Sequence, residues 1–363
     1  MSAGNKLDEK RVLEVLSSVQ DPELHKDLVS LNMVKDVAVK GDRVSLTVVL
    51  TTPACPLKME IEKDVREQLQ KAGAGEVKVK FDASVPPAPG VADKVAIPGV
   101  KNMVAVASGK GGVGKTTVAV NLAIALARLG CRVGLMDADV YGPNVPLMMG
   151  VNEQPRAVGP NRIQPLEGYG VKLMSMGFLN PGDRPLIWRG PMLHSAIQQF
   201  LRNVEWGELD YLVIDLPPGT GDVQLTLIQS VPLTGAIIVT TPSDVSLEDA
   251  RKAINMFQQV KVEVLGVIEN MSYFICPHCG ERADIFSHGG GERTAQQFGV
   301  PFLGHIPLDG EVRVGGDNGE PVTARGPDSP QAKAFYDLAG KAAARISVHN
   351  LAEARGPVVT IRD

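Results

Sequence analysis

The stretch that decides the fold is VAVASGKGGVGKTT, residues 104–117. It holds the pattern G-x-x-x-x-G-K-[ST] between an apolar strand and a helical pattern of apolar residues. Glycines let backbone N–H groups surround phosphate oxygens, and the start of the helix adds the positive end of its dipole. We therefore predict a P-loop that binds ATP. Its predicted nucleotide-binding residues are Gly109, Lys110, Gly111, Gly112, Val113, Gly114, Lys115, Thr116 and Thr117.

Three side chains are expected to handle the phosphates and Mg²⁺. Lys115 would reach the β and γ phosphates, and the Thr116 hydroxyl would ligate Mg²⁺. Asp215 ends the apolar run YLVID (211–215), which looks like a Walker B segment whose aspartate holds Mg²⁺ through water. Ligands of open α/β sheets bind beyond the carboxyl ends of the strands, so these residues are predicted to meet there.

The apolar runs after residue 100 predict the architecture. Five of them are separated by helical patterns, and they lack the polar alternation of half-exposed strands. Strands of this kind joined by helical crossovers indicate an α/β domain over residues 100–345, with a mostly parallel, doubly wound sheet. The five runs are 104–108, 132–137, 211–215, 236–240 and 265–269.

A smaller α+β domain is predicted over residues 1–82. Apolar residues recur at helical spacing within 8–19 and again after Pro56. Apolar and polar residues alternate within 44–50 and 77–81, which predicts two strands.

The flanking segments and the composition narrow the classes of function. Residues 83–99 hold four prolines and are predicted to be a linker, and residues 346–363 are predicted to be a tail without periodicity. The net charge of −4 argues against a basic surface for nucleic acid. The four cysteines are too scattered for a disulfide scaffold, and no run of about 18 apolar residues occurs. We expect a cytoplasmic protein without stable membrane association.

Cys276 and Cys279 form a Cys-x-x-Cys pair. Thiolates at this spacing bind one metal ion or one edge of an iron–sulfur cluster. Four sulfurs close such a site, and because this chain offers no second pair, a two-fold dimer would have to supply it. An iron–sulfur cluster is favoured. Zinc, shared between subunits or completed by His278 and His288, stays open, as do redox or structural thiols.

The loop GKGGVGKTT, with its second lysine, resembles the deviant Walker A loop of the MinD, ParA, nitrogenase iron protein and arsenical-pump ATPases. The resemblance implies a dimer that sandwiches nucleotide, with Lys110 of each subunit on the phosphates bound by the other. It also implies that Asp139, in DADVYGPN, positions or activates the attacking water, and that Asn270 binds the purine. The expected catalytic residues are Lys110, Lys115, Asp139 and Asp215.

Four segments, in the order SGKGGVGKTTVAVNLA, DADVYGPN, YLVIDLPPGTGD and ENMSYFICPHCG, resemble the Mrp (ApbC) iron–sulfur cluster carriers. The resemblance implies a homodimer that holds a [4Fe-4S] cluster at the subunit interface through Cys276 and Cys279. It further implies ATP hydrolysis, a cluster donor, and transfer of the cluster to apo-proteins.

The N-terminal domain resembles the small PaaD-like iron–sulfur assembly domains in VQDPE (19–23) and TTPACP (51–56). The resemblance places Cys55 at the N-terminus of a helix, a position that lowers the pKa of a thiol. Cys55 is therefore expected to be an auxiliary thiol in cluster transfer or client contact.

Two other functions use the same P-loop dimer. A partitioning or positioning switch needs a basic face or a terminal amphipathic helix, neither of which is evident, and it leaves Cys276 and Cys279 without a role. A scaffold with a zinc staple would order client proteins by binding nucleotide, without transferring a cluster. Metal content distinguishes that scaffold from a cluster carrier.

Overall fold

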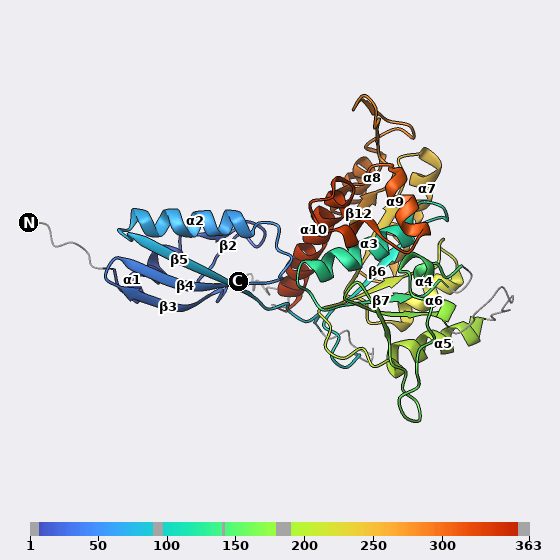
Figure 1. The fold of residues 1–363 in the computed structure, drawn as a ribbon, viewed down its shortest axis with the longest axis horizontal. Coiled ribbons are helices and arrows are strands. Elements are labelled where there is room, and N and C mark those ends of the chain that lie inside the picture. Colours follow the sequence, from blue (N-terminus) through green and yellow to red (C-terminus); the bar gives the residue numbers. More distant parts are fainter. Residues whose placement is uncertain (1–6, 90–96, 140–141, 179–189, 355–363) are drawn as a thin grey trace, which may run out of the picture. The chain divides into compact units, whose positions relative to one another are not determined.

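The structure, a computed structural model, contains two compact units (Figure 1). One unit comprises residues 1–86 with 343–363, and the other comprises residues 87–342. Each has a sheet and a hydrophobic core of its own. The stretches that the structure describes are 7–89, 97–139, 142–178 and 190–354.

The first unit is built on a three-stranded sheet. In it β4 (Arg43–Leu50) pairs antiparallel with β3 (Val34–Lys40) and parallel with β5 (Glu76–Ala83). The crossover between the parallel strands is α2 (Lys58–Lys71), which buries three residues of the predicted apolar stripe, Ile61, Val65 and Leu69. The predicted α+β fold is therefore present. A separate two-stranded ribbon consists of β1 (Gln20–Asp21) and β2 (Lys26–Asp27).

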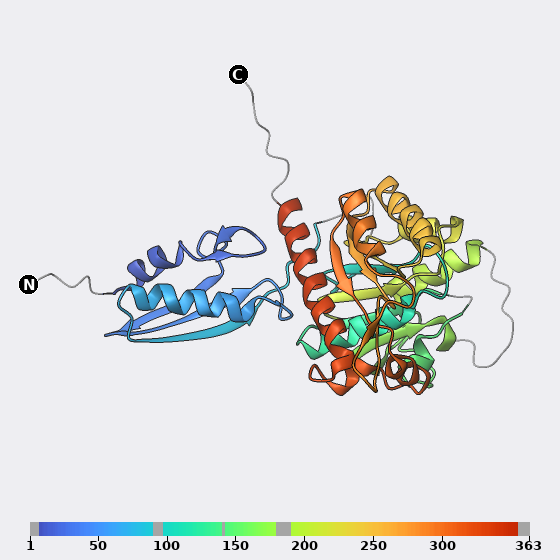
Figure 2. The same cartoon turned by 90° about the horizontal axis from the view of Figure 1, so that it is seen from above.

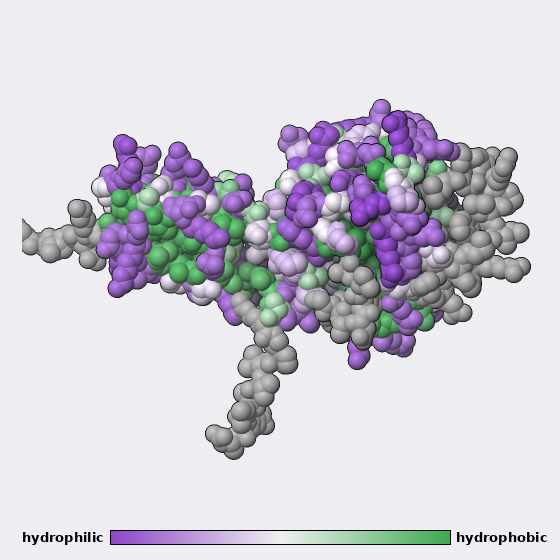
Figure 3. Space-filling view, turned by 90° about the horizontal axis from the view of Figure 1, so that it is seen from below, coloured by the Kyte–Doolittle hydropathy of each residue, from purple (hydrophilic) through white to green (hydrophobic). Residues whose placement is uncertain are grey.

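Helix α1 (Glu9–Leu16) is shorter than the predicted helical stretch. Asp8 caps its N-terminus: the Asp8 carboxylate accepts a hydrogen bond from a backbone N–H of the first turn at 2.7 Å. It ends at Leu16 because the Ser17 and Ser18 hydroxyls donate to carbonyls of the last turn. The sheet of this unit is only partly covered: alternate residues of β4 are half-exposed, and Figure 3 shows hydrophobic residues between polar ones on the unit's visible face.

The second unit is built on an eight-stranded sheet in the order β15-β12-β11-β6-β10-β7-β9-β8. Every neighbouring pair is parallel except β8 with β9. The five predicted runs form β6, β7, β10, β11 and β12, in which every residue is buried. The strands are β6 (Met103–Ala107), β7 (Val133–Asp137), β8 (Leu166–Gly168), β9 (Val171–Ser175), β10 (Tyr211–Asp215), β11 (Gly235–Thr240), β12 (Val264–Glu269) and β15 (Phe302–His305).

Helices cover both faces of this sheet, as predicted for a doubly wound fold (Figure 2). The helix after the P-loop and the first part of the last helix lie on one face, and α6, α7 and α8 lie on the other. The helices are α3 (Lys115–Arg128), α4 (Val145–Met148), α5 (Gly190–Asn203), α6 (Asp222–Ser230), α7 (Asp244–Gln259), α8 (Gly290–Phe298), α9 (Gly310–Asp317) and α10 (Pro330–Glu353). Single 3₁₀ turns are η1 (Met176–Phe178) and η2 (Val322–Arg325), and a small hairpin consists of β13 (Phe274–Ile275) and β14 (Arg282–Ala283).

The C-terminal region differs from the predicted tail, since α10 continues past Ile346 to Glu353. Ile346 and Ser347 are buried, and the Ser347 hydroxyl donates to the Thr51 carbonyl at 3.3 Å. Residues 343–354 therefore belong to the first unit. The sequence obscured this because α10 is rich in alanine, which packs without producing a strong apolar stripe. Residues 355–363 lie outside the described residues.

One carboxylate joins three adjacent strands where they begin. Asp210 accepts hydrogen bonds from the backbone N–H and the guanidinium of Arg132, at 2.9 and 3.0 Å, and from Lys101 Nζ at 3.0 Å. Burial alone would raise its pKa, but the hydrogen bonds from Arg132 and Lys101 outweigh burial and lower the pKa to about 2. Because these residues precede β10, β7 and β6, Asp210 fixes the strands at their amino ends.

We expect Asp210→Asn to lower the free energy of unfolding by about 2 kcal/mol at pH 7, because the pKa falls from 3.8 to about 2 on folding. A carboxylate with a lowered pKa stabilises above its unfolded pKa, and this contribution disappears as the pH falls through the folded pKa. The difference between variant and wild type should therefore vanish between about pH 4 and pH 2. Urea unfolding followed by tryptophan fluorescence measures it, since both tryptophans lie in residues 87–342.

Glu205→Gln is the control for this prediction. Its ion pair with Arg162 is exposed, so its loss should cost less than about 1 kcal/mol. An Asp210→Asn effect of equal size at pH 7 and at pH 3 would contradict the assignment.

Candidate functional site

Glycines shape the loop between β6 and α3. Gly114 has a φ of +82°, and a Cβ on it would lie 2.2 Å from Asn270 Nδ2. A Cβ on Gly109 would lie 2.1 Å from the Asp249 carbonyl oxygen. Only glycine fits at either position. The Asn270 amide also donates to the Val113 carbonyl at 2.9 Å, so the predicted purine-binding residue is held against the P-loop.

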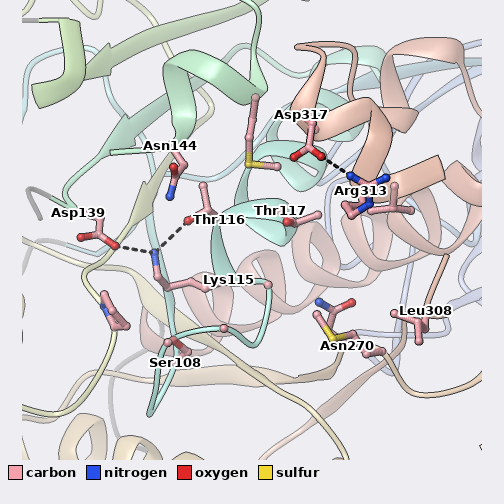
Figure 4. A pocket seen from close by; sticks show the side chains of 18 of the residues that line it. Ser108, Lys115, Thr116, Thr117, Asp139, Asn144, Asn270, Leu308, Arg313 and Asp317 are labelled. Atoms are coloured by element: carbon pink, nitrogen blue, oxygen red, sulfur yellow. Dashed lines mark hydrogen bonds and ion pairs between the residues drawn. The ribbon is translucent and has the colours of Figure 1, made fainter. Parts of the chain in front are cut away.

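Four of the predicted residues meet beside this loop, and Figure 4 shows three of them, Lys115, Thr116 and Asp139. Lys115 Nζ lies 2.6 Å from one oxygen of Asp215 and 3.9 Å from Asp139 Oδ2. The Thr116 hydroxyl donates to the other oxygen of Asp215 at 2.7 Å. Lys115 is 6 % exposed and Asp215 is fully buried, so their charges compensate each other away from water. Residues at the start of α3, the end of β10 and just beyond β7 thus form one cluster.

Asp137, the first residue of DADVYGPN, is a further member of this site, and no motif in the sequence predicts its role. It ends β7 directly beside Asp215 in register. Burial, and then the charge of Asp215, raise the pKa of Asp137. It accepts hydrogen bonds from the Ser175 hydroxyl and from the N–H groups of Asp139 and Val145. Asp137 therefore positions the segment that carries Asp139.

A cleft of about 410 Å³ opens next to the cluster. The P-loop forms one wall, and α9 contributes Arg313 and Asp317, which form an ion pair at 2.5 Å (Figure 4). Lys110 also lines the cleft, and among the described residues it has no ion pair. The cleft has the size of a small-molecule site, and the nucleotide-binding residues predicted from the sequence line it, except Gly109 and Val113.

The cysteine pair lies at the tip of the hairpin β13–β14. The Cys276 N–H donates to the Glu281 carbonyl at 2.9 Å, and the Gly280 N–H donates to the Cys276 carbonyl at 2.8 Å. The N–H groups of Cys279 and His278, and then the Cys279 thiol, hydrogen-bond to the Cys276 sulfur and lower its pKa. The two sulfurs therefore lie within hydrogen-bonding distance of each other, and the turn favours the thiolate form of Cys276, the form that binds metals.

The two histidines considered as partners of this pair occupy different places. His278 is exposed within the turn, whereas His288 Nδ1 lies 2.7 Å from the Ser272 hydroxyl, beside the buried Glu269. His288 is therefore engaged away from the thiols.

The expected lowered pKa of the Cys55 thiol is wrong. The N–H groups of Leu57 and Lys58, near the start of α2, do bond the sulfur, but burial and the carboxylates of Glu23 and Asp21 outweigh them and raise the pKa to about 11. Burial outweighs the effect of the helix terminus because the sulfur packs against the hydrophobic core of its unit, where a charged thiolate is unfavourable. The auxiliary role of Cys55 stays a prediction, and the lowered pKa that was the reason for it is absent.

The fold and the site define a P-loop NTPase with a nucleotide cleft and a cysteine pair in one turn. Residues 99–343 match the family described as NUBPL iron-transfer P-loop NTPase, and residues 9–81 match the iron-sulfur cluster assembly protein family. The chain belongs to the NUBPL iron-transfer P-loop NTPase family and carries the assembly domain in front of it. The predicted resemblance is confirmed.

Relatives of similar length carry corresponding names. An iron-sulfur cluster carrier protein from Deinococcus radiodurans is 54 % identical over 94 % of this chain and 97 % of the relative. One from Synechocystis is 51 % identical over 93 % and 97 %. Among solved structures, a nucleotide-binding protein in complex with ADP from Archaeoglobus fulgidus is 40 % identical, with a TM-score of 0.55 over 62 % of this chain and 88 % of that one. Pyrococcus furiosus MinD is 25 % identical, with a TM-score of 0.51 over 66 % and 97 %. Among the described residues, no helix has the length and apolar content needed to span a membrane.

The opposite shifts of the two thiol pKa values predict different reactivity. In the reduced, metal-free protein near neutral pH, iodoacetamide should alkylate Cys276 much faster than Cys55. A pKa of about 11 instead of 9.0 makes the thiolate fraction of Cys55 about 100-fold smaller. Mass spectrometry of the labelled peptides measures both rates, and urea-unfolded protein, in which the rates should converge, is the control. Equal rates in the folded protein would contradict the assigned environments.

Proposed function

We propose that this chain binds and hydrolyses ATP and carries a [4Fe-4S] cluster, which two copies hold between them and deliver to apo-proteins. The observation that carries the proposal is the pair of half-buried Cys276 and exposed Cys279, whose sulfurs hydrogen-bond to each other in one turn that lowers the pKa of Cys276. The family and the names of the relatives support the same function. A cytoplasmic location is part of the proposal.

The nucleotide site fits Mg²⁺. The Thr116 hydroxyl and the Asp215 carboxylate are oxygen donors 2.7 Å apart, the ligand type that Mg²⁺ prefers. When bound, Mg²⁺ would neutralise charge on the β and γ phosphates during transfer. Lys115 would exchange its ion pair with Asp215 for the phosphates, because a buried ammonium group needs a negative partner at every stage. Asp139, 3.9 Å from Lys115 Nζ, is placed to orient the attacking water.

Lys110 would complete this site in a second copy of the chain. It lines the cleft, and among the described residues it has no ion pair in its own subunit. A lysine from the partner would stabilise charge that develops on the transferred phosphate, as an arginine finger does. ATP would thereby draw two subunits together.

The same dimer would complete the cluster site. One hairpin supplies two thiolates, and a two-fold axis through the hairpin tips supplies four, the number that a [4Fe-4S] cluster requires. Ile275, Ile285 and Phe286 are large exposed hydrophobic residues on and beside the hairpin, and they would be buried by the partner. Dimerisation would thus bring nucleotide and cluster under common control.

The two sites are close in the chain. Asn270, which follows β12, bonds the P-loop, and the hairpin with Cys276 begins a few residues later. A change in the P-loop would therefore reach the hairpin through one short segment. Among the described residues, no specific contact favours a partitioning switch or a zinc-stapled scaffold over this proposal.

Anaerobic reconstitution with iron and sulfide tests the cargo. We expect about four iron and four sulfide per two chains, with loss of the cluster in Cys276→Ala. Metal and sulfide analysis, the visible spectrum and the mass of the complex measure the result. Cys55→Ala is the matched control and should keep the cluster, since Cys55 lies in the other unit. Zinc in place of iron in the wild type would favour the scaffold.

ATP turnover tests the role of Lys110. Lys110→Ala should bind nucleotide but lose about 10³-fold or more in turnover, the range for removal of a charge supplied in trans. Lys115→Ala should lose nucleotide binding itself, since its ammonium group contacts the phosphates within the same subunit. Lys333→Ala, which removes an exposed lysine of α10, is the control. Unchanged turnover in Lys110→Ala would refute the role of Lys110 across the dimer.

A further inference from the structure

Glu269, His288 and His305 form a cluster at the base of the cysteine hairpin. Glu269 Oε1 lies 3.6 Å from His288 Nδ1 and 3.8 Å from His305 Nε2, and the three candidate ligand atoms all lie within 4.8 Å of one another. Neither the P-loop nor the cysteine pair includes any of these side chains.

The sheet brings these residues together from distant parts of the sequence. Glu269 ends β12 and His305 ends β15, and the two are register partners in neighbouring parallel strands. His288 precedes Gly289, the N-cap of α8. Their spacing matches no metal-binding motif, so only the fold shows the cluster.

Glu269 is a buried carboxylate whose hydrogen-bond donors are neutral. One of its oxygens accepts from the Ser272 hydroxyl at 2.6 Å and from the Gly289 N–H at 2.9 Å, and the other accepts from the Gly291 N–H at 2.6 Å. Among the described residues, no lysine or arginine forms an ion pair with it. A buried charge needs a counter-charge, and the groups in reach are the two imidazoles.

The imidazole of His305 has an unused nitrogen. Its Nε2 is shielded from solvent and has no hydrogen-bond partner in the part of the chain that the structure describes. The ring packs against the ring of His288, with the centroids 4.5 Å apart. An imidazole nitrogen without a hydrogen-bond partner, 3.8 Å from a buried carboxylate oxygen, is the arrangement of a metal ligand.

We propose that Glu269, His288 and His305 bind a divalent transition-metal ion of the zinc or ferrous type. Two imidazole nitrogens and one carboxylate oxygen are the ligands that such ions take, at about 2.0–2.2 Å. Ligands at that distance around a tetrahedral ion are about 3.4 Å apart. The two separations from Glu269, 3.6 and 3.8 Å, exceed this by a few tenths of an ångström, and the two imidazole nitrogens lie within 4.8 Å of each other. The ion would neutralise Glu269 and use the unpartnered nitrogen of His305. His288 Nδ1, which donates to the Ser272 hydroxyl in the metal-free protein, would give up that hydrogen bond and its proton on binding the ion.

The groups around the cluster already hold the carboxylate in place. Ser272, Gly289 and Gly291 fix both oxygens of Glu269, as outer-shell donors do in metal sites. Because Glu269 precedes the cysteine hairpin and His288 follows it, the ion would join the two ends of the segment that carries Cys276 and Cys279. The site is separate from the thiols and does not depend on the proposed cargo.

The experiment uses the full chain with both thiols replaced, Cys276→Ser with Cys279→Ser, titrated with Co²⁺ as the probe. We expect one Co²⁺ per chain, with a visible spectrum of nitrogen and oxygen ligation and a rise in Tm. His305→Gln and His288→Gln should each weaken binding by at least the roughly 10- to 100-fold that loss of an outer-shell partner costs. His278→Gln, an exposed histidine nearby, should leave Co²⁺ binding unchanged.

Competition identifies the ion. Displacement of Co²⁺ by Zn²⁺ in air, or by Fe²⁺ under anaerobic conditions, supports the site and ranks the two metals. Absence of Co²⁺ binding, or binding that neither His305→Gln nor His288→Gln weakens, overturns the proposal. Both variants keep a polar side chain of similar size, so we expect them to fold. Circular dichroism and Tm without metal check this before the affinities are compared.

Discussion

The buried ion pair between Lys115 and Asp215 is the constraint on which the nucleotide site depends. Both side chains are almost fully removed from water, so each charge is tolerable only beside the other. The pair forms because β6, which leads into the P-loop, lies next to β10, which ends at Asp215. Any ligand that pairs with Lys115 in place of Asp215 must therefore also bring a cation for the Asp215 carboxylate. This links phosphate binding to cation binding.

The same strand order places a second carboxylate beside the first. Asp137 and Asp215 end adjacent strands, and their proximity helps to raise the pKa of Asp137. A carboxyl group with a raised pKa holds its proton more readily, which limits the negative charge at this buried edge. Asp137 also holds the start of the segment that bears Asp139, so one edge of the sheet carries both the charges and the positions of the site.

The other side of the sheet, β12 and β15, serves the cysteine hairpin. Asn270 ties the end of β12 to the P-loop, while the neighbouring Glu269 faces the two histidines. Successive residues of one strand end thus point to two different sites, as the alternation of side chains requires. The hairpin that carries Cys276 follows at once, so its base is fixed by contacts with both.

The sequence by itself determined the P-loop, the five central strands and the cysteine pair, because each depends on local pattern: glycines before a helix, apolar runs, two thiols in one turn. It did not show β15, a short edge strand that contains a glycine and a histidine, or the full length of α10. It misjudged Cys55, because packing against a core outweighs a helix terminus. Only the tertiary structure decided the role of Asp137 and the meeting of Glu269, His288 and His305, because strand order and burial arise from contacts between residues far apart in the chain.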